Sequence, residues 1–260
     1  RPKHSGDEIQ ITNLYPGQLV VEPITADTQA FADNTVKLQN LPAELGDCLI
    51  LRTLYESRDD AKLVSYFQWT QHLATGRPDQ IVLTWSEDPK TTQTLQWRTH
   101  IGVTEGRVSY QEKARFNRFQ PAPLITLPAL TEPLETPNIA NDPICHRHTV
   151  TLRGLKPGTT YVYSVGDGTE EGWSELSEFT TAPERTIPFS FVYMGDAQNG
   201  LDRWGSLVRN AHQERPDAAF YIMAGDLVNR GNDRDDWDSF FYNASSVYRQ
   251  RQLVPAIGNH

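Results

Sequence analysis

Three short motifs near the end of the chain carry residues that could do chemistry at metal ions. Each motif starts with a glycine, and the residues that follow are Asp196, Asp226, and the pair Asn259 and His260. Carboxylate and amide oxygens are hard metal ligands. A carboxylate can bridge two cations, which together clamp a phosphoryl oxygen and acidify a bound water. An imidazole beside them can contact phosphate or protonate a leaving alkoxide, so His260 is a catalytic candidate.

Short apolar strands must position these residues. We predict strands over 189–194, 218–224 and 253–257, joined by helices over 201–214 and 235–250 with apolar residues at helical spacing. Strands that alternate with helices in this way predict a parallel sheet with right-handed crossovers. Ligands gather at the carboxyl ends of such strands, and neighbouring strands lie about 4.8 Å apart. The three strand ends can therefore converge on one centre.

The middle motif gives Asp226 the natural bridging position, and Asn259 can add a neutral ligand. The pattern Gly-Asp-x, Gly-Asp-x-x-x-Arg-Gly and Gly-Asn-His resembles the first three motifs of the calcineurin-like metallophosphoesterases. This resemblance implies a phosphoesterase with two divalent or trivalent metal ions, either Fe, Mn or Zn. It implies Asp196 on one metal, Asp226 between the two, Asn259 on the other, and His260 near the leaving group.

Two positions depart from the family pattern. Gln198 stands where the family has a histidine, which is similar to the purple acid phosphatase branch. That branch has a metal-bound tyrosine three residues after the bridging aspartate, and this position is Asn229 here. We keep Gln198 and Asn229 as possible supporting residues and do not expect a ferric-tyrosinate centre. The later histidine ligands of the family would follow His260, so we expect only the first part of the catalytic domain, over residues 184–260.

Residues 76–183 have the pattern of an all-β sandwich. Alternating segments at 81–86, 94–98, 148–152, 160–165 and 177–181 are separated by turn residues. The stretch from Gly154 to Tyr161 resembles a fibronectin type III domain, and its place before the metal motifs is similar to the layout of purple acid phosphatases. The predicted fold is therefore multidomain: a fibronectin III-like sandwich followed by an α/β metallophosphoesterase domain.

A proline-rich stretch from Gln120 to Pro143 interrupts this sandwich, and we predict a long loop there. His146 and His148 follow it in a His-x-His pattern, which is also how the family ends its ligand set. We interpret the pair as the start of a strand, because residues two apart share one strand face and no acidic residue is adjacent.

The beginning of the chain is harder to interpret. Residues 1–75 contain short strand-like segments, at 9–14, 19–21, 35–38, 48–54 and 63–69, and we predict a small β-rich region without chemistry. Cys48 and Cys145 are either paired in a disulfide or two buried thiols, and the sequence leaves both open.

Composition excludes some function classes. The net charge of −9 argues against a nucleic-acid surface, and no apolar run is long enough to cross a bilayer. The chain starts at Arg1 without a hydrophobic leader, so we expect a mature or trimmed form that is secreted or periplasmic. The expected partner is a phosphate ester substrate. The alternative function is a binding or adhesion module whose phosphoesterase half is truncated or vestigial.

Overall fold

The computed structural model describes residues 70–117, 124–137, 139 and 141–260 and, before them, six strands. The chain forms two compact units, residues 1–73 with 135–144, and residues 74–134 with 145–260. We call these the first and the second unit. No helix in the described part of the chain combines the length and the apolar character that a membrane span requires.

The first unit contains two small antiparallel sheets. Its six strands are β1 (Pro2–Ser5), β2 (Glu8–Thr12), β3 (Asp27–Ala30), β4 (Thr35–Gln39), β5 (Cys48–Thr53) and β6 (Lys62–Gln68). The first four pair in the order β1-β2-β4-β3, and β5 pairs with β6. The predicted strands at 9–14, 35–38, 48–54 and 63–69 are confirmed with shifted ends. The predicted strand at 19–21 and the side chain of Cys48 lie outside the described residues.

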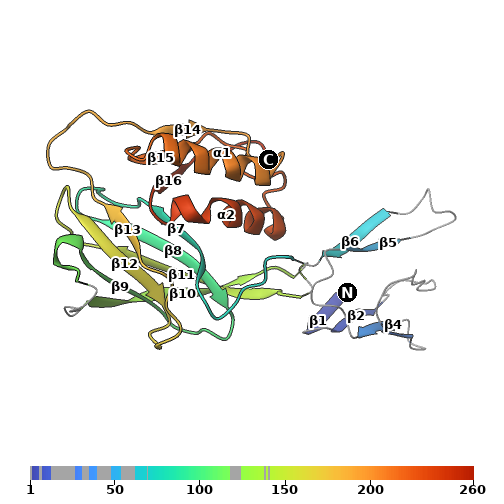
Figure 1. Ribbon diagram of the computed structural model, residues 1–260. Helices are drawn as coiled ribbons and strands as arrows, with labels where there is room; N and C mark the ends of the chain where they lie inside the picture. The colour runs from blue at the N-terminus through green and yellow to red at the C-terminus, as the bar shows by residue number, and fades with distance from the viewer. Residues whose placement is uncertain are drawn as a thin grey trace. The chain divides into compact units, whose positions relative to one another are not determined.

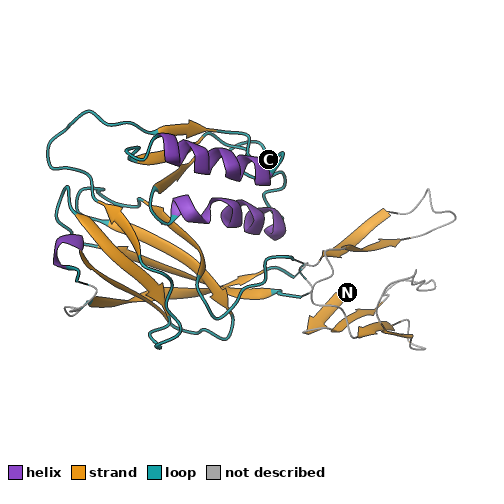
Figure 2. Cartoon of the chain, viewed as in Figure 1, coloured by secondary structure: helices purple, strands orange, loops and turns teal. Residues whose placement is uncertain are grey.

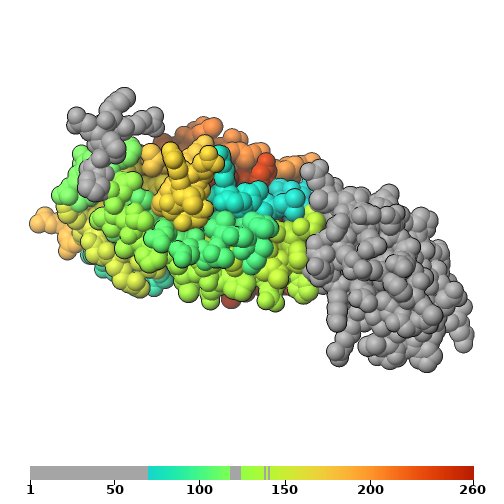
Figure 3. Space-filling model, turned by 90° about the horizontal axis from the view of Figure 1, so that it is seen from below, coloured from blue at the N-terminus to red at the C-terminus, as the bar shows by residue number. Residues whose placement is uncertain are grey.

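The second unit contains a curled antiparallel sheet of seven strands (Figure 1). These are β7 (Asp79–Thr84), β8 (Gln93–His100), β9 (Gly106–Glu112), β10 (Ile125–Glu135), β11 (Ile144–Leu152), β12 (Thr160–Gly166) and β13 (Ser177–Thr180), with the short helix η2 (Lys113–Arg115) after β9. They hydrogen-bond in the order β13-β12-β9-β10-β11-β8-β7. The two halves of the sheet enclose a core that includes Leu95, Trp97, Val108, Tyr163 and Phe179. Figure 3 shows the face of this unit where β8 to β12, in green and yellow, lie at the surface.

The loop that we predict over Gln120–Pro143 is wrong at its centre, where β10 forms an eleven-residue strand between β9 and β11. Residues Ile125 to Ala129 pair with β9, and this ladder includes Pro128. The N–H and C=O of one strand residue point toward the same neighbour, and those of the next residue toward the other. A proline therefore removes a bond to one neighbouring strand only. Pairing between β10 and β11 joins the two halves of the predicted sandwich into one continuous sheet.

The end of the chain forms a three-stranded parallel sheet with two helices, and Figure 2 shows both helices on one side of it. The elements are β14 (Val192–Met194), α1 (Leu201–Glu214), β15 (Phe220–Met223), α2 (Arg234–Tyr248) and β16 (Gln252–Pro255). The two predicted helices and the parallel pairing are confirmed. The helices bury the apolar residues that gave the prediction, such as Trp204, Val208, Phe240 and Ala244. Asp233 caps α2 by accepting a hydrogen bond from the backbone N–H of Asp235.

The first predicted strand of this sheet is too long. Its regular ladder begins at Val192, whereas we predict Phe189. A backbone hydrogen bond from Ala219 to Ser190 continues the line of the strand for a short distance. The exposed rings of Phe189 and Phe191 pack beside Phe220, with centroids 5.8 Å and 5.3 Å away. These contacts lie between side chains, so they do not extend the backbone ladder.

A buried polar network joins α2 to the outer face of β7 and β8, which Figure 1 shows below the helix. Arg98 is almost fully buried and donates two hydrogen bonds to Asp79, at 2.9 Å and 2.6 Å, and one to Asp238 on α2, at 2.7 Å. Gln80 donates to the other oxygen of Asp238 at 2.7 Å. Burial alone would lower the pKa of Arg98, but the bonds to Asp79 and the charge of Asp238 raise it. This network fixes α2 against the sheet.

His148 has a structural role in β11, as the strand interpretation of the His-x-His pattern requires. Its ring is fully buried and stacks on Trp97, with centroids 5.2 Å apart. Nε2 lies 2.7 Å from the hydroxyl of Thr99, and Nδ1 lies 2.9 Å from the hydroxyl of Thr131. Both ring nitrogens therefore have protein partners. Burial, followed by the charge of His146, lowers the pKa of His148 to about 4.

We expect His148 to make stability depend on pH. Its pKa is about 4 in the folded chain and near 6.5 in the unfolded chain, so the unfolded chain binds the extra proton between these values. The contribution of His148 to the free energy of unfolding should therefore be fully present above pH 6.5. It should be lost, by about 3 kcal/mol, as the pH is lowered toward 4. Denaturant unfolding at several pH values measures this loss. His148→Gln should flatten the dependence, whereas the exposed control His100→Gln should leave it unchanged; equal slopes in both variants would contradict the assignment.

Candidate metal centre

Two candidate ligands lie in tight turns that directly follow parallel strands. The backbone of Ala224 donates to Met194 at 2.7 Å, and that of Ala256 donates to Met223 at 2.7 Å, so the three strand ends are aligned. Asp196 and Asp226 then take positive φ angles of 52° and 48°. Residues other than glycine seldom adopt this conformation, and it is frequent where a side chain is held for function.

Asp226 is the most strongly held side chain at this edge of the sheet. Its Oδ1 accepts hydrogen bonds from the backbone N–H groups of Asn259, at 2.9 Å, and His260, at 3.3 Å. This approach requires glycine at 258, because a Cβ there would lie 1.9 Å from Oδ1. The carboxylate of Asp226 thus connects the second and third motifs directly, and Oδ2 retains acceptor capacity.

Gln198 contacts the same carboxylate. Its Nε2 lies 3.4 Å from Oδ2 of Asp226, and its backbone N–H donates to the carbonyl of Asp226 at 3.2 Å. Its Oε1 is buried and has no hydrogen-bond partner among the described residues. The side chain of Gln198 does not cap the helix that follows, because Gly200 is the N-cap of α1 and no side-chain hydrogen bond is made there. A buried oxygen without a donor fits a site in which a cation or bound water supplies the missing contact.

His260 is held from the loop that follows Asp226. Its Nδ1 lies 2.9 Å from the backbone carbonyl of Asn229. A carbonyl can only accept, so Nδ1 carries the proton, and Nε2 is left to accept or, in the charged form, to donate a proton. Asn229 therefore reaches His260 through its backbone, and both residues are exposed.

Asp196 is placed at the expected edge but is not joined to the other candidates. It is exposed, and no hydrogen bond connects its side chain to another described residue. Within the described residues no three His, Cys, Asp or Glu side chains form a group that could hold a metal ion. The donor set here consists instead of two carboxylates and the amides of Gln198 and Asn259, which suits hard cations. These residues fit metal ions, with Asp226 as the best-placed ligand and Gln198 beside it as a supporting residue.

The backbone N–H groups of Asn259 and His260 were absent from our prediction, which treated both residues by side chain alone. The glycine at the start of each motif was the feature of the sequence that could have indicated these backbone donors. Without a Cβ, the chain at 258 can approach another turn closely, and the carboxylate of Asp226 occupies that space.

Comparison with known proteins agrees with the sequence resemblance over the curled sheet. Residues 78–181 match the family model described as the purple acid phosphatase N-terminal domain. Among solved structures, the purple acid phosphatase PPD1 from seeds of yellow lupin (Lupinus luteus) matches with a TM-score of 0.57 and 18% identity, covering 99% of this chain and 52% of the lupin chain. The chain thus spans about half the length of this relative, and the likeness concerns the fold. A structure of PhoD matches with a TM-score of 0.48 and 13% identity, over 70% of this chain and 39% of that one.

Proposed function

Because residues 78–181 match the N-terminal domain of purple acid phosphatases, we propose that the chain is part of a metal-dependent phosphoesterase. In this proposal residues 76–183 are a fibronectin type III-like domain, and residues 184–260 are the first part of the α/β phosphoesterase domain. Residues 1–75 form a separate β-rich region. The observation that carries the proposal is the convergence of Gln198, Asn259 and His260 on the carboxylate of Asp226.

The roles of the residues follow from their contacts. When bound, two metal ions would neutralise the charge on the phosphoryl group and acidify a water molecule. Asp226 would hold both metals, and Oδ2 is suited to this because Oδ1 already accepts two backbone N–H groups. Asp196 would bind one of the two metals, and Asn259 would bind the other. His260, with Nδ1 fixed on the carbonyl of Asn229, would use Nε2 to contact phosphate or to protonate the leaving oxygen.

The test is hydrolysis by the full-length protein. A chromogenic phosphomonoester and a phosphodiester should both be assayed after chelation and after separate addition of Mn, Zn and Fe. We expect turnover to disappear on chelation and to return with at least one metal. Turnover that survives complete metal removal would refute a metal-dependent mechanism.

The alternative proposal is a binding or adhesion module with a truncated or vestigial phosphoesterase half. It is favoured by the absence, among the described residues, of a hydrogen bond from the side chain of Asp196 to the other candidates and of a group of three His, Cys, Asp or Glu side chains that could hold a metal ion. A full-length protein that binds no metal and hydrolyses neither ester would support this alternative. Export to a secreted or periplasmic location, and the absence of nucleic-acid and membrane partners, remain part of the leading proposal.

We expect the metal-loaded protein to lack a tyrosinate charge-transfer band. The position three residues after Asp226 is Asn229, and a neutral amide cannot donate charge to a ferric ion as a phenolate does. Visible absorption spectra of the iron-loaded protein measure this directly. Asn229→Tyr provides the matched variant and should gain a band. A strong visible band in the unmodified protein would contradict the prediction.

A further inference from the structure

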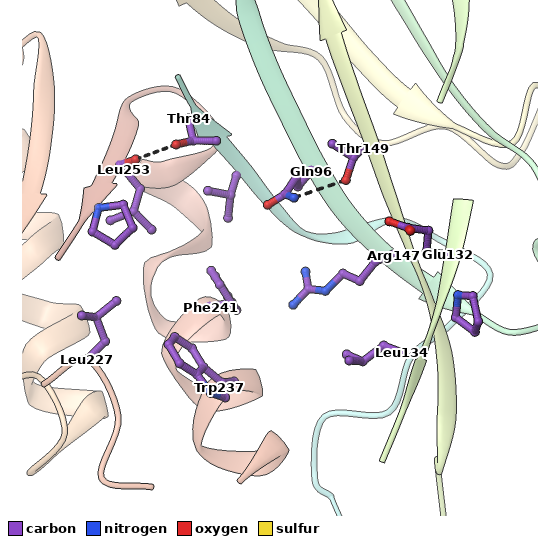
Figure 4. A pocket seen from close by; sticks show the side chains of 13 residues that line it. Thr84, Gln96, Glu132, Leu134, Arg147, Thr149, Leu227, Trp237, Phe241 and Leu253 are labelled. Carbon is purple, nitrogen blue, oxygen red and sulfur yellow. Dashed lines mark hydrogen bonds between the residues drawn. The ribbon is translucent and has the colours of Figure 1, made fainter. Parts of the chain in front are cut away.

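A groove of about 580 Å³ lies within the second unit, between α2 and β16 on one side and the outer face of the curled sheet on the other (Figure 4). Trp237 and Phe241 line it from α2, and Gln96, Arg147 and Thr149 line it from β8 and β11. The volume is in the range of small-molecule sites, and such sites usually combine an apolar lining with a few polar groups.

Among the described residues that line this groove, Arg147 is the one cation. Its guanidinium extends across the groove toward α2, and its central carbon lies 5.3 Å from the ring centroid of Phe241 (Figure 4). The side chain is half-buried, and its hydrogen bond goes to the neutral amide of Gln80, at 2.9 Å. Burial lowers the pKa of Arg147, but an arginine still stays charged.

No described carboxylate forms an ion pair with Arg147. Asp79 and Asp238 favour the charged form of Arg147 through space, but their hydrogen bonds and ion pairs go to Arg98, Gln80 and Arg234. Glu132 also lines the groove, but it is exposed on β10 and forms no ion pair with Arg147. A guanidinium that is half-buried and hydrogen-bonded to a neutral amide would gain a charge-assisted hydrogen bond from an anion in the groove.

The remainder of the lining indicates what the anion is attached to. The rings of Trp237 and Phe241 are stacked, 6.1 Å apart at 25°, and Leu134 and Pro255 add further apolar surface. The side chains of Gln96 and Thr149 are hydrogen-bonded to each other at 3.2 Å beside Arg147. A bare inorganic anion would leave these apolar side chains uncovered, whereas a flat apolar group would cover them.

We propose that this groove binds a small organic anion, with its phosphate or carboxylate on Arg147 and a flat apolar part against Trp237 and Phe241. The site is separate from the candidate metal centre and needs no metal ion.

The experiment is a calorimetric titration of chelator-treated full-length protein with phenylphosphonate, benzoate and inorganic phosphate. We expect saturable binding of phenylphosphonate or benzoate, and about tenfold weaker binding of inorganic phosphate. The comparison of phenylphosphonate with benzoate shows whether the groove prefers a phosphate-type group or a carboxylate. Arg147→Gln should weaken the preferred ligand by at least about tenfold, because a charge-assisted hydrogen bond is lost. The matched control Arg153→Gln, at an exposed arginine paired with Glu87, should change nothing.

Two further variants keep the test decisive if Arg147→Gln does not fold. Arg147→Lys keeps the charge and should weaken binding, and Phe241→Leu should weaken the aromatic ligand but not inorganic phosphate. Glu132→Gln removes a negative charge from the lining of the groove and should strengthen binding of the anion. The proposal would be overturned if no ligand bound saturably, or if all the Arg147 and Phe241 variants bound with equal affinity. It would also be overturned if binding appeared only in Glu132→Gln. Because metal is removed, none of these results bears on the phosphoesterase activity.

Discussion

Replacement of Asp226 by Asn in the full-length protein should reduce kcat/KM by at least about a thousandfold, equivalent to roughly 4 kcal/mol of transition-state stabilisation. The asparagine keeps one oxygen, which can still accept the backbone N–H groups of Asn259 and His260, so the turns should stay in place. It loses the negative charge and the second oxygen, and these are what a bridging ligand supplies. Phosphomonoester hydrolysis and metal content should be measured on the same samples.

Gln198→Ala is the matched control, because Gln198 contacts the same carboxylate through a long hydrogen bond of 3.4 Å. It is neutral, and water can replace it, so we expect a loss of about tenfold. An Asp226→Asn variant that keeps two metals and near-normal turnover would remove Asp226 from the bridging role. If Gln198→Ala lowered kcat/KM as much as Asp226→Asn, the contact between Gln198 and Asp226 would be decisive, and not the bridging of two metals by Asp226.

Replacement of Arg98 by Met should lower the free energy of unfolding by about 3 kcal/mol, because it removes a buried charge that is paired with both Asp79 and Asp238. Asp238 is the group affected most, since its side chain is 2% exposed. The effect should reach the end of the chain, because Asp238 lies on α2 and the network holds this helix to the sheet. Urea unfolding monitored by tryptophan fluorescence measures the change in the free energy of unfolding.

Arg153→Gln is the control for this variant, since Arg153 and Glu87 form an exposed pair on the same sheet. Its unfolding midpoint should equal that of the unmodified protein. An Arg98→Met variant as stable as this control would show that the network does not stabilise the second unit.

Sequence patterns predicted the end of the chain well because local signals there agree with the tertiary structure. Apolar residues at helical spacing placed α1 at Leu201–Glu214, and short strands with glycine turns placed Asp196 and Asp226 at one edge of a parallel sheet. Such a sheet leaves few alternatives for where its strand ends lie.

Long-range pairing limited the prediction elsewhere. The proline content of residues 120–143 argued for a loop, whereas β9 and β11 supply partners on both sides of β10, which no local pattern reveals. The contact between Arg98 and Asp238, far apart in the chain, is equally invisible to a local pattern. In the candidate centre, side-chain types were predictable, but the backbone donors to Asp226 depended on how two turns pack together.

Anomalous diffraction from crystals of the metal-loaded full-length protein tests the central claim most directly. We expect two peaks roughly 3.5 to 4 Å apart at the carboxyl edge of β14, β15 and β16. Oδ2 of Asp226 should contact both peaks, with Asp196 on one and Asn259 on the other. A single peak, or peaks that do not contact Asp226, would contradict a two-metal centre built on these motifs.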